Sequence, residues 1–142
     1  MNNKTFQPVL IVAGPTASGK SALALDLADA FDGVVINADS MQVYKELRVL
    51  SARPDDREIA RAPHRLYGVL SGREACSAGK WRDMAMAEIA ECHASGKLSI
   101  ITGGTGMYLN ALTEGIAPIP DIPAGIRAQV TAKLEKDGHQ AF

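Results

Sequence analysis

The fold of this chain is indicated first by eight consecutive residues, which read Gly14-Pro15-Thr16-Ala17-Ser18-Gly19-Lys20-Ser21. They match the complete pattern G-x-x-x-x-G-K-[ST], whose glycines let several backbone N–H groups point inward at phosphate oxygens. A strand-like run from Val9 to Val12 precedes the pattern, and a helix-like run follows it from Lys20. The stretch therefore predicts a phosphate-binding loop between a strand and a helix, and a site for a di- or triphosphate.

Two residues of the loop carry most of its expected chemistry. Lys20 and the N-terminus of the following helix would supply positive potential, and the Ser21 hydroxyl would be a ligand of a Mg²⁺ ion shared with the phosphates. The alternative is a glycine-rich turn that only connects the strand to the helix. Because unrelated reactions share such loops, the pattern does not name the reaction.

The composition is that of an ordinary soluble domain. With 46% hydrophobic and 22% charged residues, the 142 residues predict one α/β domain spanning 1–142. The apolar runs are shorter than the roughly 20 residues of a membrane helix, and no signal-peptide pattern opens the sequence. We therefore expect a cytoplasmic protein without a membrane partner. Cys76 and Cys92 lack Cys or His partners at metal-ligand spacing, which indicates packing residues.

The charge pattern leaves two interpretations open. The net charge of −1 argues against a large, purely electrostatic nucleic-acid surface. Between Lys45 and Arg65, however, six Lys or Arg residues stand against four acidic ones. This run is either a solvated face of mixed charge or a surface that contacts phosphates.

Apolar runs that suit strands alternate with helical patterns, which is typical of a parallel α/β sheet with crossover helices, as in P-loop NTPase-like folds. The expected strands are 9–12, 34–37 and 98–101, and a stiff connector is expected over 117–123. The expected helices run from 20, from about 80 to 93, and from about 123 to 138. Their predicted apolar faces are Leu23, Ala24, Leu27 and Phe31; Trp81, Ala85, Ile89 and Cys92; and Ile126, Val130 and Leu134.

Unusual residues follow each of the three expected strands. Ligands of parallel sheets lie beyond the carboxyl ends of the strands, so we expect the phosphate loop, Asp39 and Thr105 to converge. Asp39 is a helix N-cap, a carboxylate associated with Mg²⁺, or a general base. The segment Gly103 to Gly106 is either a tight turn or a place where the Thr105 hydroxyl and nearby N–H groups hold a substrate oxygen.

Four stretches together resemble one family, the tRNA dimethylallyltransferases, also called tRNA isopentenyltransferases. The resemblance covers about Val9 to Arg127. Besides the phosphate loop, the matching stretches are Asn37-Ala38-Asp39-Ser40-Met41-Gln42-Val43-Tyr44, Pro63-His64-Arg65-Leu66-Tyr67, Gly103-Gly104-Thr105-Gly106-Met107-Tyr108-Leu109 and Thr113-Glu114-Gly115-Ile116. The run from Asp39 to Tyr44, at this distance from the loop, is its most specific element.

The resemblance implies transfer of a dimethylallyl group from dimethylallyl diphosphate to N6 of the adenosine beside the tRNA anticodon. The loop, although such loops are commonly described as ATP-binding, would hold the diphosphate with Mg²⁺, and Asp39 would be the general base. Thr105 would contact the reacting centre, and no obligate protein partner is expected. The implied tRNA contacts are Asp39, Ser40, Met41, Gln42, Thr105 and Arg127. Tyr44 and Tyr108 are candidates for stacking on a base or for core packing.

The residues by themselves leave more than one class of reaction possible. A small-molecule kinase would place ATP in the loop and use Asp39 to deprotonate a substrate hydroxyl, and a noncatalytic nucleotide-binding switch is a third reading. Ser51-Ala52-Arg53-Pro54 stands where the family usually has Thr-Ala-Lys-Pro, and His64-Arg65 replaces a common His-His pair. The family continues with more of the core and with a helical insertion that grips the anticodon arm. We therefore expect the chain to be an N-terminal fragment with weak or no activity alone.

Overall fold

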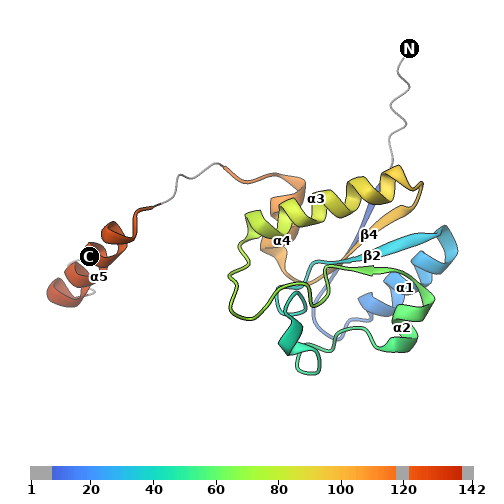
Figure 1. Cartoon of the computed structure of the whole chain (residues 1–142), viewed down its shortest axis with the longest axis horizontal. Coiled ribbons are helices and arrows are strands. Elements are labelled where there is room, and N and C mark those ends of the chain that lie inside the picture. The colour runs from blue at the N-terminus through green and yellow to red at the C-terminus, as the bar shows by residue number, and fades with distance from the viewer. Residues whose placement is uncertain (1–7, 118–121, 139–142) are drawn as a thin grey trace, which may run out of the picture.

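Four parallel strands form the sheet of this protein, in the order β1-β4-β2-β3 (Figure 1). The computed structural model describes residues 8–117 and 122–138. The strands are β1 (Val9–Ala13), β2 (Gly33–Asn37), β3 (His64–Arg65) and β4 (Leu98–Gly103). The predicted parallel α/β sheet is confirmed. Strand β3 was not predicted, because two residues are too few to show a period.

Helices cover both faces of the sheet. Helices α1 (Lys20–Phe31) and α2 (Asp56–Arg61) lie on one face, and α3 (Ala78–Ala94) and α4 (Gly106–Thr113) lie on the other (Figure 1). A short 3₁₀ helix, η1 (Lys45–Leu47), follows the segment that leaves β2. No helix in the described part of the chain has the length and apolar character needed to cross a membrane.

The core is divided by the sheet into two clusters. On β2, Val34 and Ile36 pack toward α3, whereas Val35 packs toward α1. On β4, Ile101 packs toward α3 and Ile100 packs toward α1. Both strands are buried on both faces, which is why their sequences read as continuous apolar runs rather than as alternating patterns.

The predicted apolar face of α1 was wrong at its edges. Leu23 is 52% exposed and Phe31 is 61% exposed, and the buried residues are Ala24, Leu25 and Ala28. The helix is rotated so that Ala24, Leu25 and Ala28 face the sheet, and the two alanines let its backbone approach β4 and β2 closely. The spacing of the apolar residues therefore predicted the helical period correctly. The predicted buried face of α1, however, was displaced by about one residue from the observed one.

The predicted face of α3 is confirmed, because Trp81, Ala85, Ile89 and Cys92 are all buried. The Trp81 ring stacks on Tyr108 with centroids 4.7 Å apart, so Tyr108 is a core residue rather than a platform for a base. The Trp81 indole Nε1–H donates to the Asn37 carbonyl at 2.8 Å. This bond ties α3 to the carboxyl end of β2.

The last helix, α5 (Ala124–Asp137), has the predicted position but no buried residue. Ile126 and Val130 of its apolar stripe are 49% and 46% exposed. Figure 1 shows α5 separate from the sheet and its four covering helices. Of the predicted connector 117–123, residues 118–121 lie outside the described residues.

Candidate functional site

The phosphate loop leaves β1 at Ala13 and enters α1 at Lys20. Gly19 lies at φ 82° and Ala17 at φ 62°, in the left-handed region that costs a residue with a side chain free energy. The first α1 amide with an intrahelical acceptor is that of Leu23, which donates to the Gly19 carbonyl at 3.1 Å. Among the residues that the structure describes, the amides of Lys20, Ser21 and Ala22 have no acceptor, so they are free to bind an anion at the positive end of the helix.

Lys20 lies over this loop. Its ammonium Nζ donates to the Pro15 carbonyl at 2.8 Å, so the charge is held at the loop rather than extended into solvent. The ammonium makes no ion pair with a carboxylate in the described part of the chain. An anion that entered the loop would find this cation and the helix N-terminus together.

Asn37, the last residue of β2, shapes the turn that carries Asp39. It is fully buried. Its side-chain Nδ2 donates to the Asp39 carbonyl at 3.0 Å and to the Leu66 carbonyl at 3.1 Å, and its Oδ1 accepts the Asp39 N–H at 2.8 Å. All of these groups are satisfied inside the protein, so the backbone of Asp39 is held firmly.

Asp39 closes a turn and does not cap a helix. Its Oδ1 accepts the Met41 N–H at 2.8 Å, a local bond typical of Asp in turns. Residues 40–43 form turns, so the N-cap interpretation was wrong. The second carboxylate oxygen, Oδ2, accepts no hydrogen bond from the residues that the structure describes. The half-buried side chain therefore keeps acceptor capacity for another group.

The turn after β4 packs directly on the turn after β2. A Cβ at Gly103 would lie 2.2 Å from the Ala38 carbonyl carbon, so only glycine permits this approach. The Thr105 N–H donates to the Ala38 carbonyl at 3.2 Å, and the Thr105 Oγ1 accepts the Ser40 N–H at 3.0 Å. Thr105 is thereby fixed beside the segment that carries Asp39.

The same turn also meets the phosphate loop. A Cβ at Gly104 would lie 3.2 Å from the Gly14 carbonyl oxygen. The three strand ends that were predicted to converge therefore do meet at one end of the sheet. The structure brings together the loop, Asp39, Ser40 and Thr105, but it does not bring Arg127 there, since Arg127 lies on the exposed helix α5.

Two neutral phenols lie within electrostatic range of Asp39. Burial raises the pKa of Tyr67, and the charges of Asp39 and Glu58 raise it further. Burial also raises the pKa of Tyr108, followed by its hydrogen bond to the Cys76 side chain, with smaller contributions that include Asp39. The phenols of Tyr67 and Tyr108, which interact electrostatically with Asp39, are thus uncharged.

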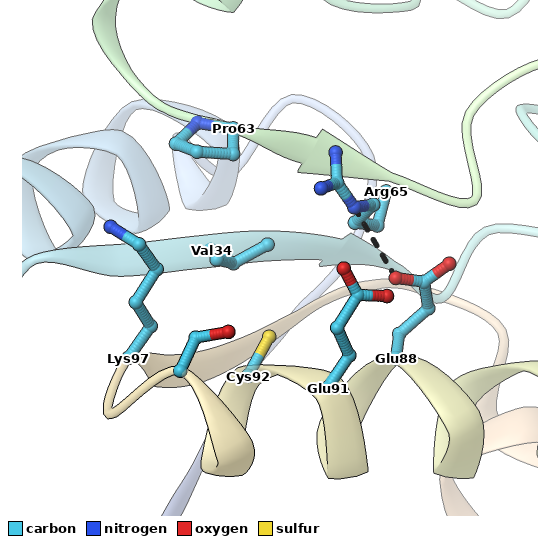
Figure 2. Close-up of a pocket in the computed structure, with 8 residues that line it drawn as sticks. Val34, Pro63, Arg65, Glu88, Glu91, Cys92 and Lys97 are labelled. Carbon is cyan, nitrogen blue, oxygen red and sulfur yellow. Dashed lines mark ion pairs between the residues drawn. The ribbon is translucent and has the colours of Figure 1, made fainter.

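Three of the six basic residues in the charged run from Lys45 to Arg65 are paired with carboxylates. Arg48 bonds Asp56 at 2.9 Å, and Arg61 bonds Asp26 and Asp29 of α1. Arg65 lies 3.3 Å from Glu88 in a pocket between α3 and the β2-β3 edge, next to Val34 at the start of β2 (Figure 2). That pocket is remote from the phosphate loop at the other end of the strands. The mixed-charge interpretation holds for these three arginines.

Sequence reasoning missed Asn37 and Tyr67 as parts of the site. A fully polar amide inside the apolar run of β2 was the available signal for Asn37, because buried amides must be bonded. Tyr67 follows the short strand β3 and carried no comparable signal. Among the described residues, no group of three or more His, Cys, Asp or Glu residues is placed to hold a metal ion.

Comparisons with known proteins agree on one family. A family model described as IPP transferase matches residues 42–142. A curated tRNA dimethylallyltransferase of Rhodospirillum centenum is 57% identical over 126 residues, which are 89% of this chain and 40% of that protein. One of Paramagnetospirillum magneticum is 55% identical over 138 residues, 97% of this chain and 44% of that protein. The chain therefore spans less than half the length of these relatives.

Solved structures show the same similarity. A tRNA isopentenylpyrophosphate transferase of Bacillus halodurans matches with a TM-score of 0.77 and 31% identity, covering 96% of this chain and 45% of that one. A eukaryotic dimethylallyltransferase, described as acting on tRNA, matches with a TM-score of 0.77 and 31% identity over 84% of this chain and 31% of its own.

Proposed function

Because this chain belongs to the IPP transferase family, we propose that it is the diphosphate-binding and adenosine-facing part of a tRNA dimethylallyltransferase. The reaction moves a dimethylallyl group from dimethylallyl diphosphate to N6 of the adenosine beside the anticodon. The observation that carries this proposal is the packing of Gly103 on Ala38 and of Gly104 beside Gly14. It places one carboxylate, Asp39, at the same end of the sheet as the phosphate loop.

The loop stabilises the leaving group. When the allylic C–O bond breaks, its electron pair stays on the diphosphate, and negative charge develops there. Lys20 and the free amides at the start of α1 are donors aimed at that charge, which is the kind of stabilisation that lowers a barrier. The Lys20 ammonium has three donors, so it can bind phosphate oxygens while it keeps its 2.8 Å bond to the Pro15 carbonyl.

Asp39 takes the proton. The adenine N6 amine forms the new C–N bond to the allylic carbon, and one N6 proton must leave as the nitrogen becomes positive. The free Oδ2 of Asp39 accepts it, while Oδ1 remains bonded to the Met41 N–H and keeps the carboxylate oriented. Products are the substituted adenosine, diphosphate and a protonated Asp39 that returns its proton to water.

The residues present suit Mg²⁺. Ser21 offers a hydroxyl in the first turn of α1, and the hydroxyl at this place in a phosphate loop is a ligand that Mg²⁺ uses together with phosphates and waters. Ser21 would hold the ion, and the bound ion would supply positive charge to the diphosphate. The lack of a three-residue metal cluster in the described residues is compatible with such a site.

The tRNA contacts follow the same geometry. Ser40, Met41 and Gln42 continue the turn that carries Asp39, and Thr105 is bonded to that turn. The target base must leave its stack to reach Asp39, which costs a few kcal/mol and least in a single-stranded loop. Arg127 on α5 remains a proposed tRNA contact of the whole protein.

Titration calorimetry in Mg²⁺ tests the proposal on the 142-residue chain. Dimethylallyl diphosphate and inorganic pyrophosphate should bind well and ATP poorly, and Lys20→Met should weaken both diphosphates at least about tenfold, since it removes a charge-assisted bond. Tight ATP binding with no response to dimethylallyl diphosphate would instead support a kinase. Equal binding by Lys20→Met would remove the loop from the proposal.

A further inference from the structure

A second pocket opens beside the Asp39 turn and has no part in the chemistry described above. We call it the Arg53 pocket. Its volume is about 190 Å³, and its charged and aromatic lining comes from Arg48, Arg53, Asp56, His64 and Tyr67. This volume suits a single group of a larger ligand better than a whole ligand.

Hydrogen bonds join the Arg53 pocket to the segment proposed to meet the adenosine. The Gln42 side-chain Nε2 donates to the Ser51 carbonyl at 2.8 Å and to the Ala52 carbonyl at 3.2 Å, just before Arg53. The Arg53 Nη1 donates to the Tyr44 carbonyl at 3.1 Å. The wall of the pocket and the turn from Asp39 to Tyr44 are therefore one bonded unit.

Tyr67 also links the Arg53 pocket to Asp39. It lines the Arg53 pocket, and the Asp39 charge acts on its phenol. The Gly68 N–H next to it donates to the Gln42 carbonyl at 2.8 Å. The Arg53 pocket therefore lies beside the segment that carries Asp39.

The charge in the pocket favours an anion. Arg48 is already paired with Asp56 at 2.9 Å. Arg53 makes no ion pair with a carboxylate in residues 8–117 and 122–138, and its planar guanidinium presents further donors suited to a phosphate. Two acidic groups also act on the lining: Glu58 acts on His64, and Asp39 and Glu58 both act on Tyr67.

The aromatic part of the lining favours a base. The His64 and Tyr67 rings meet edge to face with centroids 5.4 Å apart. The His64 Nδ1 lies 2.8 Å from the Ala62 carbonyl oxygen, which assigns the ring hydrogen to Nδ1 and leaves Nε2 as an acceptor. Phosphate-binding Arg beside aromatic rings is the combination by which proteins hold single-stranded RNA.

We propose that the Arg53 pocket binds the nucleotide next to the target adenosine, with Arg53 on its phosphate and its base against His64 and Tyr67. This inference rests on the proposed function, because it assumes that an RNA adenosine reaches Asp39. It adds a contact that holds the RNA strand while the adenosine is out of its stack.

The test compares RNA binding with diphosphate binding on the 142-residue chain. The RNA probe is a synthetic anticodon stem-loop with the target adenosine, titrated at several salt concentrations. Arg53→Gln should weaken RNA binding about tenfold and reduce the slope of log K against log salt by about 0.7, the value for one phosphate on a single strand. Arg53→Lys should keep the slope, and pyrophosphate binding should not change in either variant.

A second variant tests the proposed contact between the RNA base and His64. His64→Ala should weaken RNA binding severalfold without changing the salt slope, because stacking releases no counterions. Arg73→Gln is the matched control, since Arg73 is exposed and lines no part of the pocket. The proposal is overturned if Arg53→Gln and Arg73→Gln behave alike, or if the unaltered chain does not bind the RNA. Failure of pyrophosphate binding in the unaltered chain would count against the proposed function instead.

Discussion

The Ser40 backbone N–H donates to the Thr105 hydroxyl at 3.0 Å, across 65 residues of sequence. This bond joins the turn after β2 to the turn after β4. The Thr105 N–H strengthens the junction by donating to the Ala38 carbonyl at 3.2 Å. The position of Asp39, which lies between Ala38 and Ser40, therefore depends on Thr105 whether or not Thr105 touches a substrate.

Replacing Thr105 by Val removes the acceptor and leaves the part-buried Ser40 N–H without its partner. We expect the free energy of unfolding to fall by about 1–3 kcal/mol, the range for an unmet buried donor. Thr105→Ser keeps the hydroxyl and should lose much less. Urea unfolding of the three chains measures the difference. A larger loss in Thr105→Ser than in Thr105→Val, which keeps the methyl group, would show that the methyl group, not the bond, matters.

Asp39 offers a cleaner separation of chemistry from structure. Asp39→Asn keeps an Oδ1 that accepts the Met41 N–H, so the turn should persist and pyrophosphate binding should be equal or tighter. It removes the proton acceptor, so transfer should be abolished in the polypeptide that carries the activity. Asp39→Ala should also lose about 1 kcal/mol of stability with the turn bond. Prenylation retained by Asp39→Asn would remove the base assignment.

The sequence predicts the sheet and the meeting of its strand ends well, because both follow from local patterns. The phosphate loop has a fixed residue order, β1, β2 and β4 are apolar runs, and ligands of parallel sheets lie beyond the carboxyl ends. The face of α3 followed from its period, with Trp81 in the largest buried position.

What the sequence did not predict depends on tertiary contacts. Leu23 and Phe31 have the spacing of a buried stripe, yet the sheet covers the face of Ala24, Leu25 and Ala28 instead. Asn37 belongs to the site because its amide reaches Leu66, 29 residues away, and no local pattern marks that bond. Arg53 and Arg61 look alike in the charged run, and only the fold pairs Arg61 with Asp26 and Asp29 while leaving Arg53 in a pocket.

Gly103 should be the least replaceable glycine of the site. An alanine there would place its Cβ 2.2 Å from the Ala38 carbonyl carbon and 2.3 Å from its oxygen, and both atoms are backbone. Relief requires the β2 and β4 turns to separate, so we expect a loss of about 3 kcal/mol or more, at the upper end for an overpacked site. Soluble expression and thermal unfolding measure it.

Gly106, three residues later, is the matched control. No atom lies within 4 Å of a Cβ built there, and the residue begins α4. Gly106→Ala should be neutral or stabilise by up to about 1 kcal/mol, because alanine favours the helix and restricts the unfolded chain. A similar loss in both variants would argue that the helix start, and not the contact with Ala38, is sensitive.

The stability of the chain should depend on pH through His64. Burial lowers the pKa of His64 from its usual 6.5, although the Ala62 carbonyl and Glu58 act in the opposite direction. Between the lowered pKa and 6.5 the unfolded chain binds more protons than the folded one, so the free energy of unfolding rises with pH across this window. His64→Asn keeps a donor for the Ala62 carbonyl but does not titrate. Urea unfolding from pH 8 to pH 5 should therefore show a smaller loss on acidification in His64→Asn than in the unaltered chain, and parallel curves would mean that the folded and unfolded chains bind the His64 proton equally.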